Sequence, residues 1–285
     1  MVIAADRFPV PARELSQPQM LDPSCVVALT RGEVAELRLS TGKPGNALTI
    51  SALGDLSRAL SVARDDARCR LIVLRSVDGD FCLGLDLELA ASTDLTTVRQ
   101  HCRLFWDCLE AIVRIGKPTI ACVDGRSAGG GVGLAAACDI VLSAEGATFQ
   151  LPEVVIGLVP ALIAPFLLRR LPPSKLAYLT LSTRTIGARE AHAMGLVDEV
   201  AEGPIDAWTA RLVRRLLRAS PDAIAEFKLS LAGAEATQFA ERKALALEVS
   251  ERWLTSEVVR NALRDFSSGL APRWFNKLPE REDRP

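Results

Sequence analysis

The sequence predicts an α/β fold, because short apolar strands alternate with amphipathic helices along most of its length. Two short runs, within residues 69–77 and 119–125, have apolar centres bounded by charged or turn residues. Strands of this kind are buried on both faces of a sheet. A stretch with helical periodicity, residues 96–115, separates them. Strands joined through helices form parallel sheets with right-handed crossovers.

The first third of the chain is divided by turn residues. Residues 1–24 are rich in proline and polar residues without a sustained period, which predicts a flexible N-terminal arm. From residue 25 to 40, alternating apolar and polar residues predict two strands around a turn at Arg31 and Gly32. A helix over residues 48–66 should follow, leading into the first buried strand.

Beyond Pro118 the predicted elements are a buried strand, a glycine run leading into a small-residue helix at 131–138, and a strand at 139–144. After Pro160 the pattern predicts helices to the end. We divide the chain into the arm, an α/β core, a helical oligomerisation region and a charged tail: residues 1–24, 25–200, 201–275 and 276–285.

Composition excludes several classes of protein. The 285 residues are 49% hydrophobic and 24% charged, which is globular, and a net charge of −1 gives no strong general attraction to nucleic acid. No apolar run approaches the roughly 20 residues of a membrane helix, and the N-terminus lacks a signal-peptide layout, so we expect a cytoplasmic protein. Seven scattered cysteines and two histidines predict reduced core thiols and no metal site.

Two glycine-containing segments indicate an oxyanion hole. Residues 125–133 place three consecutive glycines at a helix N-terminus, where backbone N–H groups are unpaired and a carbonyl oxygen can approach closely. Residues 80–86 follow the other buried strand, and Gly84 allows a sharp turn that aims the amide of Leu85. Two converging amides stabilise the charge that develops on a thioester oxygen. A glycine turn needed only for tight packing is the alternative interpretation.

Glu153 is the candidate acid/base. It follows a proline among apolar residues, where burial would raise its pKa and favour proton transfer. A glutamate near a helix start can instead simply compensate the helix dipole. The neighbouring glycine segments favour catalysis.

Three stretches together resemble the enoyl-CoA hydratase/isomerase (crotonase) family: FCLGLD, the block from GRSAGGGVGL to LPEVVIGLVP, and AREAHAMGLVDEV. The resemblance covers roughly residues 25–275. It implies a crotonase-like spiral core of ββα turns, a C-terminal helical region, and homotrimers or hexamers. It also implies an oxyanion hole at Leu85 and Gly130, a catalytic Glu153, and no cofactor beyond the coenzyme A or carrier-protein handle of the acyl group.

The chain departs from the family at Gly133, where hydratases have their other catalytic glutamate. That glycine and residues 157–186 resemble the dehydratases of polyketide β-branching cassettes. The resemblance implies dehydration of a 3-hydroxy-3-methylglutaryl group on an acyl carrier protein to 3-methylglutaconyl. We expect Gly133 to leave a gap for the branched β-carbon. An enoyl-CoA isomerase, hydratase or decarboxylase, or a non-catalytic acyl-thioester binding protein, are alternatives.

Further residues are candidates for contacts with substrate. Asp86, His101 and Asp107 could supply a second polar group at the acyl end, and Lys228 could lie near the phosphates of the handle, although structural roles would also explain them. Five basic residues could attract an acidic carrier protein: Arg169, Arg170, Lys175, Arg184 and Arg189.

A serine esterase is the competing hypothesis. Residues 125–129 also match G-x-S-x-G around Ser127, the nucleophile-elbow pattern. A triad would require His192, which is the only histidine downstream. The additional glycines after Ser127 disfavour this hypothesis.

Overall fold

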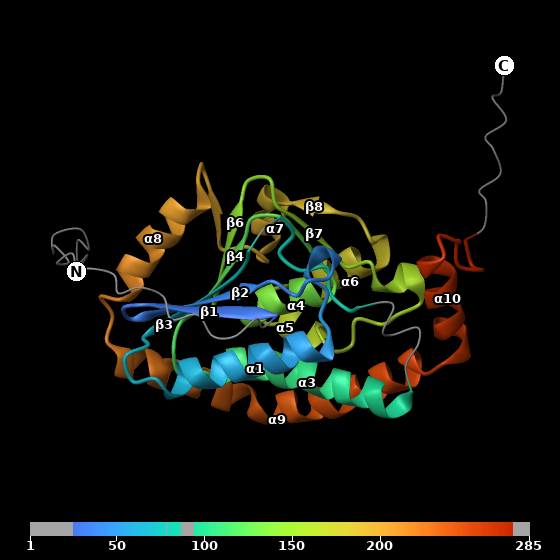
Figure 1. The fold of residues 1–285 in the computed structure, drawn as a ribbon, viewed down its shortest axis with the longest axis horizontal. Helices are drawn as coiled ribbons and strands as arrows, with labels where there is room; N and C mark the ends of the chain where they lie inside the picture. The colour runs from blue at the N-terminus through green and yellow to red at the C-terminus, as the bar shows by residue number, and fades with distance from the viewer. Residues whose placement is uncertain (1–24, 78, 87–93, 276–285) are drawn as a thin grey trace, which may run out of the picture.

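The computed structural model describes residues 25–77, 79–86 and 94–275, and a six-stranded sheet runs through it (Figure 1). A hairpin of two antiparallel strands leads into parallel pairings, as predicted. In spatial order the strands are β1 (Val26–Arg31), β2 (Val34–Leu39), β3 (Leu71–Ser76), β4 (Thr119–Val123), β6 (Ile140–Ala144) and β9 (Glu199–Ala201). The N-terminal arm and the charged tail lie outside the described residues.

Strand β3 confirms the prediction of burial on both faces. Ile72 and Leu74 belong to the main hydrophobic core, whereas Leu71 and Val73 pack in a separate cluster on the opposite face. That cluster includes Ile205 and other residues of helix α8 (Ile205–Leu216). Since side chains alternate along a strand, helices must cover both faces.

A second, three-stranded sheet was not predicted. It consists of β5 (Arg126–Ala128), β7 (Thr148–Gln150) and β8 (Ile186–Gly187). The expectation of helices alone after Pro160 is therefore wrong, because β8 and β9 lie in that region. Strands of two or three residues show no measurable period, so the sequence pattern could not reveal them.

Helices α1, α3 and α9 form layers beneath the main sheet (Figure 1). Helix α9, of 34 residues, packs along α3, and an aromatic cluster joins them. In it the ring centroid of Trp106 lies 5.0 Å from that of Phe166 and 5.4 Å from that of Phe239. Besides α8, the helices among the described residues are α1 (Ile50–Asp65), α3 (Leu95–Arg114), α4 (Gly130–Ala137), α5 (Ala164–Leu167), α6 (Pro173–Ser182), α7 (Ala188–Met194), α9 (Pro221–Leu254) and α10 (Glu257–Ser267), with 3-10 turns η1 (Pro44–Asn46) and η2 (Glu153–Ile156).

The C-terminal helices share the core of the strands that precede them. Phe239 of α9 lies in the main hydrophobic cluster, and Ile205 of α8 packs on the sheet. The predicted boundary at residue 200 thus falls within the last strand, β9, and the core continues beyond it.

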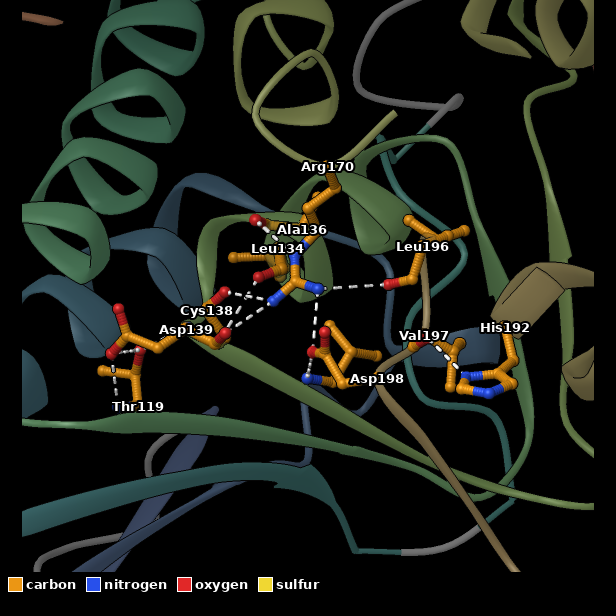
Figure 2. A network of polar contacts seen from close by, with 11 residues as sticks. Thr119, Leu134, Ala136, Cys138, Asp139, Arg170, His192, Leu196, Val197 and Asp198 are labelled. Carbon is orange, nitrogen blue, oxygen red and sulfur yellow. Dashed lines mark hydrogen bonds and ion pairs between the residues drawn. The ribbon is translucent and has the colours of Figure 1, made fainter. Parts of the chain in front are cut away.

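Lys228 is a buried structural residue. Its side chain is 6% exposed, and its Nζ lies 2.5 Å from Asp139 Oδ2 and 3.0 Å from the Lys117 carbonyl oxygen. Asp139 also accepts hydrogen bonds from the backbone N and the hydroxyl of Thr119, which Figure 2 shows beside it. The expected contact with a handle phosphate is therefore wrong, and so is the simpler account of a solvated lysine.

We expect Lys228→Ala to lower the free energy of unfolding by about 3 kcal/mol, because it leaves Asp139 partly buried without its cation. Urea denaturation measures the change, with the exposed Lys175→Ala as a control that should alter stability by less than about 0.5 kcal/mol. Equal effects of the two substitutions would contradict the structural role.

Candidate functional site

Two segments far apart in the sequence run side by side at the centre of the site. Residues 79–85 pair with β5, since Phe81 N donates to the Arg126 carbonyl at 2.9 Å and Ala128 N donates to the Cys82 carbonyl at 2.9 Å. The Arg126 guanidinium also binds Asp80 through two contacts of 2.6 and 2.7 Å. This pairing holds the two predicted amide segments in register.

Glycines allow these backbones to approach closely. Gly84 has a φ of +88°, and a Cβ added there would lie 2.8 Å from the backbone N of Gly130. A Cβ at Gly131 would lie 2.0 Å from the Cys82 carbonyl oxygen. Any larger residue would push the segments apart. The glycine run thus serves tight packing as well, and the packing is what brings Leu85 and Gly130 together.

The backbone N–H groups of Leu85 and Gly130 have no hydrogen-bond acceptor among the residues the structure describes. Their neighbours are paired, since Gly129 N donates to Gln150 and Leu48 N donates to the Gly84 carbonyl at 2.7 Å. Gly130 is the first residue of α4, where an N–H has no partner within the helix. Both residues line the same cavities, which leaves two amide donors for a ligand oxygen.

Two hollows meet at these amides. The inner cavity, of about 80 Å³, is mostly apolar, and the outer hollow, of about 470 Å³, reaches Lys43 and Asp86. Their shared lining is Leu85, Gly130, Glu153 and Leu158. The rest of the inner lining is Leu48, His101, Phe105, Val159, Pro160, Leu162, Ile163, Ser250, Trp253 and Leu254.

Glu153 lies at the junction of the two hollows. Its Oε1 is 3.0 Å from the position a Cβ would occupy at Gly129, and its buried Oε2 has no hydrogen-bond partner in the described part of the chain. Burial raises the pKa of its carboxyl to about 7, which confirms the predicted direction. The group can therefore both give and take a proton near neutral pH.

The expected gap beside Gly133 does not exist. A Cβ at Gly133 would lie 2.3 Å from Cγ2 of Ile163, which is buried and fills this space. Ile163 belongs to the segment that resembles the β-branching dehydratases. Gly133 is absent from the lining of both hollows, and the predicted contact with substrate is wrong.

Of the other polar residues predicted to contact substrate, Asp86 and His101 line the hollows and Asp107 does not. Asp86 lines the outer hollow, 3.6 Å from the ammonium of Lys43, and His101 lines the inner cavity. Asp107 is wrong as a substrate contact, because its carboxylate faces outward and pairs with Lys243 of α9 at 2.9 Å. Asp107 and His101 both lie on α3, but His101 is on the helix face that lines the cavity and Asp107 is on the side that faces solvent.

Sequence reasoning missed the contribution of α9 to the cavity. Ser250, Trp253 and Leu254 have the spacing of a single helix face and close the inner cavity from the C-terminal side. That spacing predicts a buried face, but nothing in it indicates which cavity the face covers.

The serine-esterase hypothesis is wrong. Ser127 is 1% exposed in the middle of β5, and its hydroxyl has no partner in the described part of the chain. The His192 ring instead contacts the Val197 carbonyl at 3.0 Å, and Figure 2 shows the two side by side.

Most of the basic residues proposed for carrier binding are engaged within the chain. Arg169, Arg184 and Arg189 pair with Glu235, Glu190 and Glu145. Figure 2 shows the Arg170 guanidinium among backbone carbonyls at the C-terminal end of α4, where it donates to Cys138 and Asp139 at 2.8 Å each and pairs with Asp198. A cation there complements the helix dipole.

The described residues contain no group of three or more His, Cys, Asp or Glu side chains that could hold a metal ion. None of the helices among these residues could span a membrane. The seven cysteines are free thiols; six are buried, whereas Cys25, predicted to be a core thiol like the others, is partly exposed.

Comparisons with known proteins bear on the family and the fold. The family model for enoyl-CoA hydratase/isomerase matches residues 30–277. Enoyl-CoA hydratase ACTT6 of Alternaria alternata is 34% identical over 70% of this chain and 67% of its own length. Methylglutaconyl-CoA hydratase of Mus musculus is 35% identical over 55% of this chain, but the matched part spans only 51% of that protein.

Solved structures give the same picture. An enoyl-CoA hydratase from Mycobacterium avium superposes with a TM-score of 0.77 at 32% identity, covering 85% of this chain and 94% of that one. A Bacillus subtilis protein described as a polyketide biosynthesis enoyl-CoA hydratase has a TM-score of 0.78 over 87% and 99% of the two chains. At 24% identity, this likeness concerns the fold alone.

Glu153 should reduce the stability of the folded protein at high pH. Because its pKa is raised from 4.5 to about 7, its contribution to stability is greatest below pH 4.5 and is lost as the pH rises through 7. At pH 8 we expect Glu153→Gln to be more stable than the original protein by about 3 kcal/mol, and at pH 4 to differ little. Denaturant titrations at both pH values measure this, and a pH-independent difference would contradict the raised pKa.

Proposed function

The chain belongs to the enoyl-CoA hydratase/isomerase family, and we propose that it dehydrates a 3-hydroxyacyl thioester at the junction of the two hollows. The observation that carries this proposal is the meeting of two unpaired amides, those of Leu85 and Gly130, with one protonatable carboxyl, that of Glu153. Family membership makes it a hydratase/dehydratase-type enzyme.

The two amides would bind the thioester oxygen. When a proton leaves Cα, negative charge moves to this oxygen, and donors that are already oriented stabilise it more than they stabilise the ground state. The apolar surroundings strengthen this effect because they exclude water. The resulting enolate then expels the β-hydroxyl.

Glu153 would handle the protons alone. Ile163 occupies the space of the other family glutamate, and Glu153 is the one carboxylic acid in the described lining of the inner cavity. As a carboxylate it removes the Cα proton, and as the resulting acid it delivers that proton to the leaving hydroxyl, which departs as water. A pKa near 7 suits both transfers.

For the acyl group we propose 3-hydroxy-3-methylglutaryl on an acyl carrier protein, converted to 3-methylglutaconyl in polyketide β-branching. Two observations support it: the resemblance of residues 157–186 to the β-branching dehydratases and the similarity to methylglutaconyl-CoA hydratase. The inner cavity of about 80 Å³ suits a short acyl end better than a long fatty chain. Such a handle and substrate fit a cytoplasmic enzyme.

Isomerisation of an enoyl thioester is the second candidate. Moving a double bond requires one acid/base that transfers a proton between two carbons. Because Ile163 fills the place of the second family glutamate, Glu153 supplies that single carboxyl. The two reactions are distinguished by whether water is released.

The handle would lie in the outer hollow, beside Lys43 and Asp86. Lys43 has a side chain that is 42% exposed there and could meet an acidic carrier surface.

We expect Glu153→Gln to reduce kcat/KM for dehydration of the 3-hydroxy-3-methylglutaryl thioester by about 10²–10⁴-fold, since the amide keeps the shape but cannot transfer protons. In the original enzyme kcat/KM should fall about tenfold for each pH unit below 7, as Glu153 becomes protonated. Steady-state kinetics on carrier protein and on coenzyme A test both. Near-normal turnover by the variant, or faster hydration of crotonyl-CoA than dehydration of the branched substrate, would refute the proposal.

We also propose a homotrimer or hexamer formed through the C-terminal helices. The supporting observation is a set of exposed apolar side chains on α9 and α10: Phe227, Leu229, Leu231, Leu245, Trp253, Val258 and Phe266. Burial of such surface contributes about 25 cal/mol per Å² to association. Light scattering at micromolar concentration should give at least three times the chain mass, and a monomer would contradict the assembly.

A further inference from the structure

The inner cavity contains two polar side chains that the proposed reaction does not use. Ser250 of α9 is 4% exposed, and its Oγ has no hydrogen-bond partner among the described residues. His101 of α3 is 5% exposed and lies in the wall of the same cavity. A buried hydroxyl without a partner is costly, and one that lines a cavity can gain its partner from a ligand.

The hydrogen bond that His101 makes determines which ring nitrogen can accept a hydrogen bond from a ligand. Its Nε2 lies 2.8 Å from the Leu48 carbonyl oxygen, and because a carbonyl only accepts, Nε2 must carry a hydrogen. Burial lowers the pKa of the imidazole, which keeps the unoccupied ring neutral. Its Nδ1 is then an acceptor, with no partner in the described part of the chain.

The inner cavity has no cation in its described lining. Glu153 lines it, and no lysine or arginine does. In the outer hollow Asp86 acts on His101, but Asp86 is paired with Lys43 at 3.6 Å. The nearby pair of Arg99 on α3 and Glu251 on α9 is mutually neutralised at 2.9 Å. A carboxylate could not enter this surrounding without a compensating positive charge.

We propose that Ser250 and His101 form a receptor for a carboxyl group at the far end of the acyl chain, and that this group binds together with one proton. The proton lies between a carboxyl oxygen and His101 Nδ1, and the Ser250 hydroxyl donates to the other oxygen. Each unpaired polar atom gains a partner, and the site carries no net added charge. The inference rests on the proposed function, since a 3-hydroxy-3-methylglutaryl group has such a carboxyl.

The receptor explains how a cavity without a fixed cation could prefer a charged substrate. The free ligand carboxyl is ionised at neutral pH, and the free imidazole is neutral, so binding must take up one proton from solution. Glu153 also titrates near pH 7, but it meets any acyl thioester in the same way. The proton uptake that Glu153 contributes is therefore the same for two ligands that differ only at the far end of the acyl chain, and it cancels when they are compared.

Calorimetric titration tests the receptor without any turnover. The probes are saturated thioesters that cannot be dehydrated: 3-methylglutaryl-CoA, its neutral isostere 3,5-dimethylhexanoyl-CoA, and 5-hydroxy-3-methylpentanoyl-CoA. Titrations at pH 7.5 in buffers of different ionisation enthalpy give the protons taken up. The variants are Ser250→Ala, His101→Gln, which can retain the donor to Leu48, and the control Ser230→Ala on an exposed face of α9.

We expect 3-methylglutaryl-CoA to take up about one proton more than its isostere, and Ser250→Ala to weaken its binding about tenfold while changing isostere binding less than about twofold. His101→Gln should abolish the additional proton uptake, and Ser230→Ala should change nothing. Equal proton uptake by both ligands, equal weakening of both by Ser250→Ala, or tighter binding of the 5-hydroxy ligand than of the acid would overturn the receptor. Failure of the proposed reaction appears separately, as absent turnover with this binding intact.

Discussion

The site depends on one backbone contact, the approach of residues 79–85 to residues 125–131. Hydrogen bonds from Phe81 and Ala128 align the two segments, and glycines at 84 and 131 let them meet at distances that no Cβ allows. Because each segment directly follows a buried parallel strand, the sheet fixes where both begin. The amides of Leu85 and Gly130 are therefore oriented by the core itself, before any ligand binds, and orientation in advance is what makes such donors effective.

Charged groups buried outside the two hollows are paired, whereas two polar groups that line the hollows are not. Lys228 and Asp139 neutralise one another, and Arg170 satisfies carbonyls at the end of α4. At the junction and in the inner cavity, Glu153 and Ser250 each retain a buried oxygen without a partner among the described residues. Such unpaired groups lower stability, and in a cavity they are available to a ligand.

Gly133 stands where the family resemblance places a second glutamate, and Ile163 fills the volume in front of it. The chain therefore has an apolar wall there and not a larger pocket. Protein interiors accept different pairs of facing residues when the total volume is conserved. In the proposed reaction proton transfer therefore falls to Glu153, whose pKa burial raises to about 7.

The sequence alone determined the α/β class, the order of the main strands and helices, and the three groups at the junction. These follow from local pattern: apolar periods, glycine runs after buried strands, and a motif of fixed spacing around Glu153. Tertiary structure alone decided which face of a helix meets the cavity. Asp107 and His101 lie on one helix, yet only His101 turns inward, and Lys228 is buried where its sequence suggested solvent. Side-chain direction and volume depend on packing between elements distant in sequence, as with Ile163 against Gly133 and with Ser250 and His101 in the wall of one cavity. Local pattern carries no information about those neighbours.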